Sequence, residues 1–281
     1  MKPATPSARD ARAGAARAGR RDDGTERIVN APATVEVVRD GDVVLITLRR
    51  EHKRNAVDRV LADALDAALN AFEDDGTLRV AVLTGGASFF CAGSDLQSRG
   101  DYVTGRGGEY GIIRRRRRKP LIAAVEGAAL GGGFEIVLAC DMVVAGERAV
   151  FGLPEVARGV LPTCGALFRA LHALPPNVAR EMVLGAEPID AARAHALGVV
   201  NRIVPDGQAA AQAMALARRI AGNSPLAVQA CLKAMNGLLA SADAQGWAAT
   251  AEALDAIRDT EDRQEGVRAF FEKRAPVWRG R

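Results

Sequence analysis

Short apolar runs alternate with helical patterns in the first half of the chain, and this alternation restricts the fold more than any other sequence feature. Residues 80–84, 121–125 and 142–145 have the length and composition of buried strands. Residues 57–72 place apolar side chains at helical intervals, and residues 132–140 form a second helical pattern that begins at three glycines. Strands separated by helices in this order need right-handed crossovers, which predicts an α/β fold with a mainly parallel sheet.

Before this alternating part the sequence predicts a β-hairpin, and after it the sequence predicts mainly helices. Residues 35–38 and 43–48 are two β-branched runs about a tight polar turn, which predicts a hairpin at the start of the fold. After Pro162 the pattern becomes largely helical, so the chain is α/β first and helical later. Helices are expected at residues 164–173, 177–184, 190–197, 207–221, 225–239 and 246–273.

The N-terminal residues contain almost nothing that a core would bury. Ala, Arg, Gly and Pro dominate residues 1–27, so we expect a disordered extension. A transit peptide is the alternative, but such peptides are poor in acids and this segment holds four. The predicted organisation is a disordered Ala/Arg-rich extension at residues 1–30, an α/β core at 31–205 and a helical C-terminal region at 206–281.

The distribution of charge argues against a polyanionic partner. The chain has a net charge of +4, with 38 Lys and Arg residues and 34 acidic residues. Seven of those cations and four of those acids lie in residues 1–27, which leaves 31 cations and 30 acids in the remainder. The body of the protein is almost neutral, so nucleic acid is not its expected partner.

Composition and cysteine spacing indicate a soluble protein in a reducing compartment. Hydrophobic residues make up 48% of the chain and charged residues 26%, which excludes disorder throughout. No apolar run reaches the roughly 18–20 residues of a membrane helix. The cysteines have neither CxxC nor Cys/His metal spacing, so we expect reduced thiols, no metal site, no membrane contact and a cytoplasmic location. They are Cys91, Cys140, Cys164 and Cys231.

Two glycine-rich segments follow strand ends, where a backbone that approaches a ligand needs residues without side chains. One runs from Thr84 to Leu96, and the other is Gly131–Gly133. Neither matches the phosphate-loop or dinucleotide-binding pattern. Free N–H groups at the helix start after Gly131 would contribute to an oxyanion hole, in which two backbone N–H groups bind one carbonyl oxygen. Tight strand-to-helix turns are the alternative role for these glycines.

Two carboxylates lie next to these segments. Glu135 falls in the first turn of the helix that begins at Gly132, and Glu155 follows a strand further along the chain. Two carboxyl groups at one site divide acid and base work when burial and repulsion separate their pKa values. Glu135 has the alternative role of complementing the helix dipole. Spacing alone leaves open whether the two side chains meet.

Several further motifs occur in order along the chain. They are Lys53-Arg54-Asn55-Ala56, Val82-Leu83-Thr84-Gly85, Phe90-Cys91-Ala92-Gly93-Ser94-Asp95-Leu96, residues 119–127, Ala129-Leu130-Gly131-Gly132-Gly133-Phe134-Glu135, Phe151-Gly152-Leu153-Pro154-Glu155, and residues 191–201, 223–227 and 260–270. Together they resemble the enoyl-CoA hydratase/isomerase, or crotonase, family. The resemblance runs from about Val35 to the C-terminus and does not include the N-terminal extension.

The resemblance implies a fold and a binding mode. The fold would be a spiral of repeated ββα units whose helical C-terminal region builds homotrimers or dimers of trimers. The substrate would be an acyl-CoA, whose thioester oxygen would accept hydrogen bonds from the backbone N–H groups of Ser94 and Gly132. Other substrate contacts would come from Arg54, Ala56, Asp95, Leu96, Gln97 and Gly133. A serine nucleophile is the alternative role for Ser94, but the chain lacks a GxSxG elbow and an identifiable His partner.

Hydratases of the family carry two acids, and this chain has both at matching places, Glu135 and Glu155. The resemblance therefore implies reversible hydration of a trans-2-enoyl-CoA to a 3-hydroxyacyl-CoA. One carboxylate would take a proton from the water that adds at C3, and the other would give a proton to C2. No metal or redox cofactor is needed, because CoA is part of the substrate. Double-bond isomerisation or thioester hydrolysis is the alternative activity, and a non-catalytic or RNA-binding member is a more distant one.

The chain departs from the family at two places. Many hydratases continue after the second acid with Pro-Gly-x-Gly-Gly-Thr-Gln-Arg-Leu. This chain instead reads Pro162-Thr163-Cys164-Gly165-Ala166-Leu167-Phe168-Arg169, so bulk replaces glycine near the expected water. Gln97 stands where a Lys directed at the CoA phosphates is frequent, so other cations would bind those phosphates.

Five consecutive arginines, Arg114 to Arg118, precede the predicted strand at residues 121–125. Three interpretations of this run remain open: a solvated helix face, a contact to CoA phosphates, and nucleic-acid binding. Tyr110 is the only aromatic residue nearby, which is weak support for stacking on single-stranded nucleic acid.

Overall fold

The computed structural model describes residues 18–20, 26–28, 34–98 and 102–281. Its strands are β1 Ala18–Arg20, β2 Glu26–Ile28, β3 Val35–Asp40, β4 Val43–Leu48, β5 Val80–Thr84, β6 Val103–Thr104, β7 Gly108–Glu109, β8 Leu121–Val125, β9 Ala128–Leu130, β10 Met142–Gly146, β11 Val150–Gly152, β12 Ile189–Asp190 and β13 Arg202–Val204. Its helices are α1 Arg59–Asp74, α2 Gly132–Leu138, α3 Ala166–Ala173, α4 Pro176–Gly185, α5 Ala191–Ala196, α6 Ala209–Ala221, α7 Pro225–Ile257 and α8 Glu261–Glu272, with 3₁₀ turns η1 Glu51–Lys53 and η2 Val156–Arg158.

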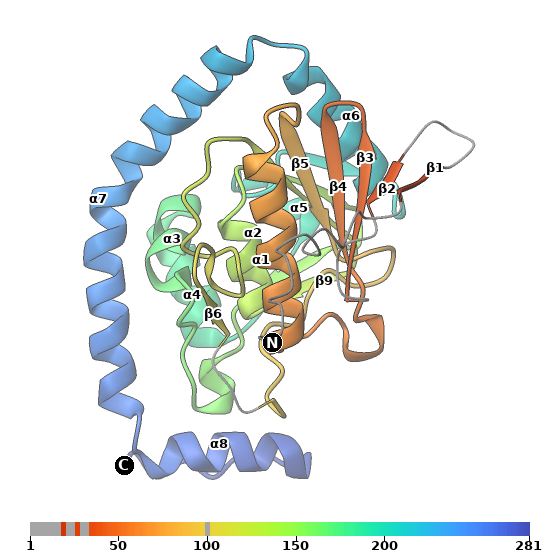
Figure 1. Ribbon diagram of the computed structural model, residues 1–281. Coiled ribbons are helices and arrows are strands. Elements are labelled where there is room, and N and C mark those ends of the chain that lie inside the picture. The colour runs from red at the N-terminus through yellow and green to blue at the C-terminus, as the bar shows by residue number, and fades with distance from the viewer. Residues whose placement is uncertain (1–17, 21–25, 29–33, 99–101) are drawn as a thin grey trace, which may run out of the picture.

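A mixed sheet with the strand order β1-β2-β3-β4-β5-β8-β10-β13 forms the centre of the fold (Figure 1). β3 and β4 pair antiparallel about the turn at Gly41, as the two β-branched runs predict. From β4 onward, neighbouring strands β4, β5, β8, β10 and β13 pair in parallel. The predicted α/β class with a mainly parallel sheet is therefore confirmed.

A smaller sheet, ordered β12-β11-β9, gives the fold its spiral form. β8 belongs to the large sheet, and β9, which follows after Glu126 and Gly127, belongs to the small one; β10 and β11 repeat this step. β9 and β11 pair in parallel, and an isolated bridge joins Cys91 to Ala129 of β9. Each turn of the spiral thus adds one strand to each sheet, as the family resemblance implies.

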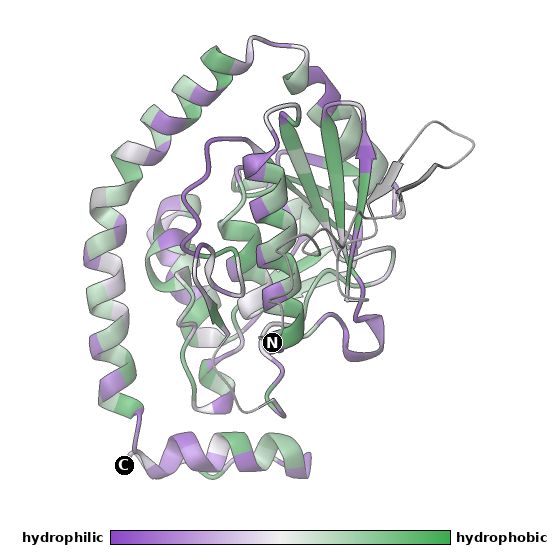
Figure 2. Cartoon of the chain, viewed as in Figure 1, coloured by the Kyte–Doolittle hydropathy of each residue, from purple (hydrophilic) through white to green (hydrophobic). Residues whose placement is uncertain are grey.

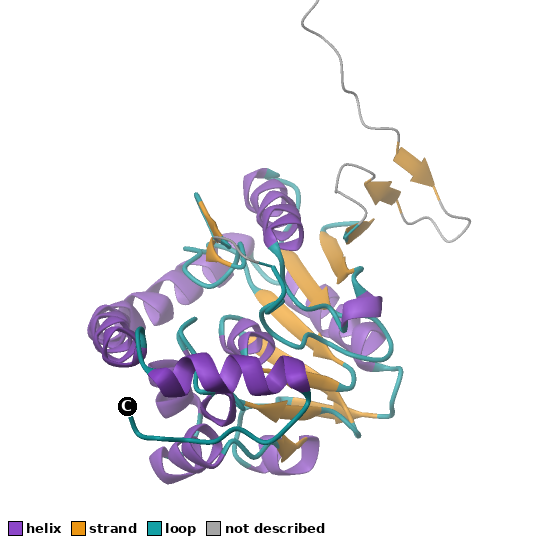
Figure 3. Ribbon diagram, turned by 90° about the horizontal axis from the view of Figure 1, so that it is seen from below, coloured by secondary structure: helices purple, strands orange, loops and turns teal. Residues whose placement is uncertain are grey.

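Two apolar clusters cover the two faces of the large sheet. The larger cluster includes the buried face of α1 and extends to α2. The smaller one lies beneath α6, where Ala213, Met214 and Ala217 belong to the same cluster as Val82 and Ile122 of the sheet. Figure 3 shows helices on both sides of the strands. α6 falls within the predicted C-terminal region but packs as part of the core, so the helices outside the core begin with α7.

α7 runs along the outside of the molecule and is longer than the sequence predicts (Figure 1). We expected separate helices over residues 225–239 and 246–273, but α7 continues through the positions between them. Residues 240–245 contain no Pro or Gly that would end a helix. The break comes later, at Thr260, whose side chain accepts a hydrogen bond from the Arg263 N–H and caps α8.

Polar and apolar residues are interspersed along α7 (Figure 2). In the described part of the chain, no helix combines the length and the hydrophobicity that a membrane crossing needs.

Part of the N-terminal extension forms strands. We expected disorder over residues 1–30, yet β1 pairs with β2, and β2 pairs with β3 at the edge of the large sheet. Backbone hydrogen bonds to an edge strand need no apolar side chain, so composition alone does not predict them. The rest of residues 1–30 lies outside the described part of the chain.

Candidate active site

A loop and a helix start meet beside the small sheet. The loop is residues 91–94, and the helix is α2, which begins at Gly132. Gly93 has φ +90°, and a Cβ atom on it would lie 2.9 Å from the Gly132 nitrogen and 3.0 Å from the Leu130 carbonyl oxygen. Any side chain at Gly93 would push these segments apart. The two glycine-rich segments of the sequence therefore bring two backbones into contact.

Each segment presents a backbone N–H group that has no acceptor among the described residues. The Val57 N–H donates to the Gly93 carbonyl at 2.7 Å, and the Asp95 N–H donates to the Val57 carbonyl at 2.8 Å. These two bonds form a parallel bridge between Val57 and Ser94. In such a bridge the N–H of Ser94 points away from Val57. The Gly132 N–H belongs to the first turn of α2. Among the residues that the structure describes, neither N–H donates a hydrogen bond, so both are available to one oxygen atom.

Glu135 projects from the first turn of α2 into the protein interior and is 2% exposed. Its Oε1 accepts hydrogen bonds from the backbone N–H groups of Cys164 at 2.7 Å and Ala166 at 3.0 Å. Burial, with a smaller contribution from the charge of Glu155, raises the pKa of this carboxyl to about 8. Glu135 therefore does more than complement the helix dipole, because it is buried and joined to a second loop.

Glu155 directly precedes η2 and is also buried. Its Oε1 faces Gly131, where a Cβ atom would lie 2.9 Å away. Its Oε2 is buried and has no hydrogen-bond partner among the described residues. Burial raises the pKa of this carboxyl to about 7, although Arg158 acts to lower it. A buried acceptor without a partner costs about 1–3 kcal/mol, so this oxygen is available to a polar group from outside the protein.

The structure thus brings together four residues that the sequence singles out. Ser94 and Gly132 meet through the close approach at Gly93, and Glu155 lies against Gly131. The Gly131 carbonyl accepts the Glu135 N–H at 3.0 Å, so both acids, whose meeting the sequence left open, lie at the start of α2.

Tyr110 also lies in this site, although no sequence motif predicted a role for it there. Its hydroxyl is 2.6 Å from Ser94 Oγ, and the side chain is 4% exposed. Burial, with contributions from Cys164 and Glu135, raises the pKa of its hydroxyl well above 10. No family motif includes Tyr110; the available signal is its place between Gly108 and Gly111, which allow a tight backbone path.

The other predicted substrate contacts, except Gly133, lie on two adjoining loops, residues 50–56 and residues 92–97. The loops are joined by the Ala92 N–H, which donates to the Arg54 carbonyl, and by Lys53 Nζ, which donates to Gln97 Oε1 at 2.9 Å. Asp95 pairs with Arg50 at 2.8 Å. The predicted contacts on these loops are Arg54, Ala56, Asp95, Leu96 and Gln97, whereas Gly133 is buried in α2 against the Cys91 carbonyl oxygen.

The segment that departs from the family, Thr163 to Phe168, holds Glu135 through its backbone. The residues that stand here in place of the family's glycines do not disturb this contact, because the N–H groups of Cys164 and Ala166 both donate to the carboxyl of Glu135. Phe168 is buried and packs edge-on against Trp247 of α7, with ring centroids 5.0 Å apart. The added bulk therefore fills the space between α3 and α7.

The arginine run has turn and irregular structure, and less and more exposed side chains alternate along it. Arg115 pairs with Asp66 at 2.5 Å, and Arg117 donates to Asp141 Oδ1 at 2.8 Å. The side chains of these arginines are 2% and 7% exposed, whereas Arg114, Arg116 and Arg118 are exposed. The interpretation as a solvated helix face is wrong, because no helix forms at these residues and two of the five side chains are buried in ion pairs.

Comparison with known proteins supports the family resemblance over most of the chain. The sequence pattern of the family described as enoyl-CoA hydratase/isomerase matches residues 39–281. The chain is 38% identical over 250 residues to 2,3-dehydroadipyl-CoA hydratase of Escherichia coli, a match that covers 87% of this chain and 98% of that protein. It is 38% identical over 255 residues to mevalonyl-coenzyme A hydratase of Aspergillus fumigatus, covering 84% of this chain and 91% of that protein.

A solved structure gives the same result for the fold. The crystal structure of carnitinyl-CoA hydratase from Mycobacterium avium matches with a TM-score of 0.84 and 40% identity, covering 89% of this chain and 100% of that one. The structural match agrees with the fold described above. The chain belongs to the enoyl-CoA hydratase/isomerase family.

Proposed function

We propose that the protein is an enoyl-CoA hydratase, which adds water reversibly to a trans-2-enoyl-CoA and gives a 3-hydroxyacyl-CoA. The observation that carries this proposal is a pair of buried carboxyl groups with raised pKa values, Glu135 and Glu155, beside two free backbone N–H groups. Relatives named as hydratases of acyl-CoA thioesters support the same class of reaction.

In this mechanism the N–H groups of Ser94 and Gly132 bind the thioester carbonyl oxygen. They stabilise the enolate-like negative charge that develops on that oxygen when water adds to C3. Glu155 Oε2, which has no partner among the described residues, accepts a hydrogen bond from the attacking water. The ionised carboxyl of the pair takes a proton from this water, and the protonated carboxyl gives a proton to C2.

The two carboxyl groups share their proton. With pKa values of about 8 for Glu135 and about 7 for Glu155, the pair holds about one proton midway between these values. Titrations of interacting groups belong to the pair, so one proton on two carboxyl groups supplies both the base and the acid. The reaction needs no metal or redox cofactor.

The CoA part of the substrate would bind at the rim formed by the two loops that carry Arg54 and Gln97. Lys53 Nζ, which is bonded to Gln97, supplies a cation where family members often have a Lys. Exposed apolar side chains on α7, among them Leu226, Met235 and Leu238, support assembly into a homotrimer or a dimer of trimers. A cytoplasmic location accords with this chemistry.

The test is the loss of ultraviolet absorbance of the conjugated thioester when the protein is mixed with crotonyl-CoA or with a longer 2-enoyl-CoA. Wild type should hydrate both substrates, and the double variant Glu135→Gln/Glu155→Gln should hydrate neither. Absence of hydration by wild type, together with conversion of a 3-enoyl-CoA to the 2-enoyl isomer, would replace this proposal with isomerisation.

A further inference from the structure

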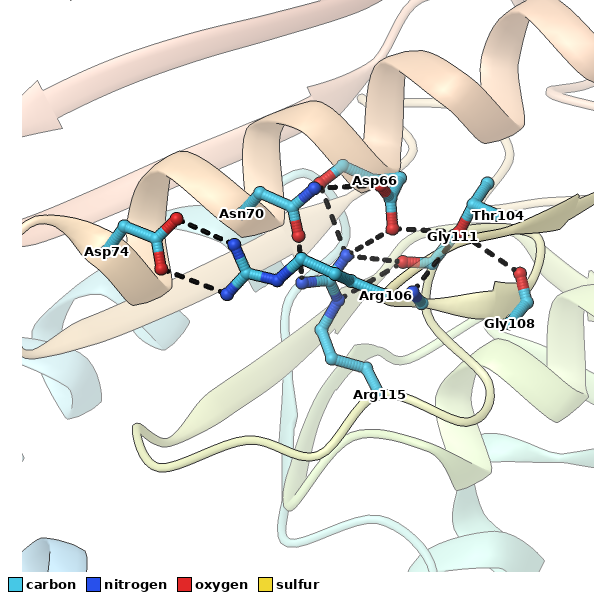
Figure 4. A network of polar contacts seen from close by, with 9 residues as sticks. Asp66, Asn70, Asp74, Thr104, Arg106, Gly108, Gly111 and Arg115 are labelled. Atoms are coloured by element: carbon cyan, nitrogen blue, oxygen red, sulfur yellow. Dashed lines mark hydrogen bonds and ion pairs between the residues drawn. The ribbon is translucent and has the colours of Figure 1, made fainter.

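The segment that carries Tyr110 is fixed to α1. We call residues 102–118 the Tyr110 loop. Its polar contacts with α1 are Arg115 to Asp66 at 2.5 Å and to Asn70 at 2.6 Å, Thr104 to Asp66 at 2.8 Å, and Arg106 to Asp74 at 2.6 and 2.9 Å (Figure 4). These contacts come from both sides of Tyr110 in the sequence, so α1 holds the loop before and after this residue.

The loop holds Tyr110 in a backbone conformation that side chains rarely adopt. Tyr110 has φ +55°, in the left-handed region. The next residue, Gly111, packs so closely on α1 that a Cβ atom there would lie 2.5 Å from the Ala62 carbonyl oxygen. A non-glycine residue in this region costs about 1–3 kcal/mol, and the conformation persists only where surrounding contacts impose it. The contacts with α1 therefore direct the Tyr110 side chain into the site.

Tyr110 touches both halves of the proposed oxyanion hole. Its hydroxyl oxygen lies 2.6 Å from Ser94 Oγ in the loop of residues 91–94. The position that a Cβ atom on Gly132 would take is 2.5 Å from the same oxygen and 2.7 Å from Cε2 of the ring. One buried side chain thus spans the distance between the two segments that present the free N–H groups.

We propose that Tyr110 is a positioning residue that sets the separation and orientation of the Ser94 and Gly132 N–H groups. This inference rests on the proposed role of those groups in binding the thioester oxygen. The hydroxyl bonds the Ser94 side chain, and the edge of the ring packs on Gly132. Movement of either segment away from the other would break one of these contacts.

The phenol performs this role in one protonation state. The pKa of its hydroxyl lies well above 10, because the group is buried and lies near Cys164 and Glu135. Tyr110 is therefore neutral between pH 6 and 9, where the glutamates titrate. Removing the hydroxyl should change the rate without changing the shape of the pH profile.

The test compares Tyr110→Phe, Ser94→Ala and their double variant with wild type. Tyr110→Phe keeps the ring that packs on Gly132 and removes only the hydroxyl. Tyr102→Phe is the matched control, because Tyr102 is the other tyrosine of the chain and its hydroxyl donates instead to the carbonyl oxygens of Asp95 and Ser98.

The first readout is the spectrum of bound 4-dimethylaminocinnamoyl-CoA, whose absorption moves to longer wavelength when its thioester oxygen accepts hydrogen bonds. Wild type and Tyr102→Phe should produce this shift in full. Tyr110→Phe and Ser94→Ala should each reduce it by about half, and the double variant should reduce it no further, because both changes remove the same hydrogen bond. For crotonyl-CoA, kcat should fall about tenfold with KM within about twofold of wild type.

Two results would overturn the inference. One is a full spectral shift in Tyr110→Phe, and the other is a double variant whose loss equals the product of the two single losses. If Tyr110→Phe does not fold, Ser94→Ala tests the same hydrogen bond from its other end. A wild-type protein that shifts the spectrum but hydrates no enoyl-CoA would refute the proposed hydratase function and leave the positioning role to be decided by the spectra.

Discussion

The arginine run and the glutamate pair both place ionisable groups inside the protein, but among the described residues only the arginines have ionic partners there. Arg115 pairs with Asp66, and Arg117 pairs with Asp141. Glu135 has two backbone N–H donors on one oxygen, and Glu155 Oε2 has no partner among the described residues. A buried charge with an ionic partner holds elements together, whereas a buried carboxyl without one readily gains or loses a proton.

Neutralising one glutamate should have the largest effect. Glu155→Gln keeps the size of the side chain but removes its ability to exchange a proton, so we expect kcat for 2-enoyl-CoA hydration to fall about 10³-fold. Steady-state kinetics at pH 7.5 measure this loss. Glu73→Gln is the matched control, because Glu73 is equally buried but accepts hydrogen bonds from the Arg118 and Lys119 N–H groups, away from the site. Equal losses in both variants would contradict the comparison.

Breaking the ion pair between Arg117 and Asp141 should lower the stability of the protein and leave its catalytic rate unchanged. Arg117→Met leaves the Asp141 carboxylate partly buried without its cation, which should lower the free energy of unfolding by about 3 kcal/mol. Urea unfolding at a fixed subunit concentration measures this change, and kcat of the folded protein should stay within twofold of wild type. A large fall in kcat with unchanged stability would place Arg117 in the chemistry instead.

Glu135→Gln should stabilise the protein at alkaline pH. The folded-state pKa of Glu135, about 8, lies above the ordinary value of 4.5, so the folded state binds more protons between these values. Stability of wild type therefore falls as pH rises through this window. The variant should match wild type near pH 4.5 and exceed it by about 4–5 kcal/mol above pH 8, because each pKa unit corresponds to about 1.4 kcal/mol. Urea unfolding at both pH values tests this, and an advantage that is the same at both would count against it.

The smallest effect is expected at an exposed arginine. Arg114 lies over the Trp247 ring at 3.7 Å, so Arg114→Met should cost about 0.5–1 kcal/mol of stability. Arg116→Met, at the next exposed position, is the control and should change stability by less than about 0.5 kcal/mol. Thermal melting of the two variants side by side would reveal whether the stacked arginine differs from its neighbour.

The sequence predicted the strands and the motif glycines well, because their signals are local. Residues 80–84 and 121–125 are strands with the predicted bounds, since each is a short apolar run that ends at a turn or polar residue. The close approach at Gly93 also follows from local composition, because glycine is needed where backbones meet. The family motifs located the two glutamates for the same reason.

Long-range packing accounts for what the sequence did not predict. Arg115 and Arg117 are buried because Asp66 and Asp141, distant in sequence, lie beside them, and no local pattern distinguishes them from Arg116. Tyr110 reaches the site only because its loop is fixed to α1 in a left-handed conformation. The pairing of β2 with β3 likewise depends on backbone groups and not on side-chain type.

The most direct test of the glutamate pair is the pH dependence of kcat/KM for crotonyl-CoA hydration. One carboxyl must be ionised and the other protonated, so wild type should give a narrow bell with limbs near pH 7 and pH 8, and Glu155→Gln should abolish the bell with the activity. A profile that is flat from pH 5.5 to 9.5, or a bell that persists at full height in Glu155→Gln, would contradict the claim that these two buried carboxyl groups carry out the reaction.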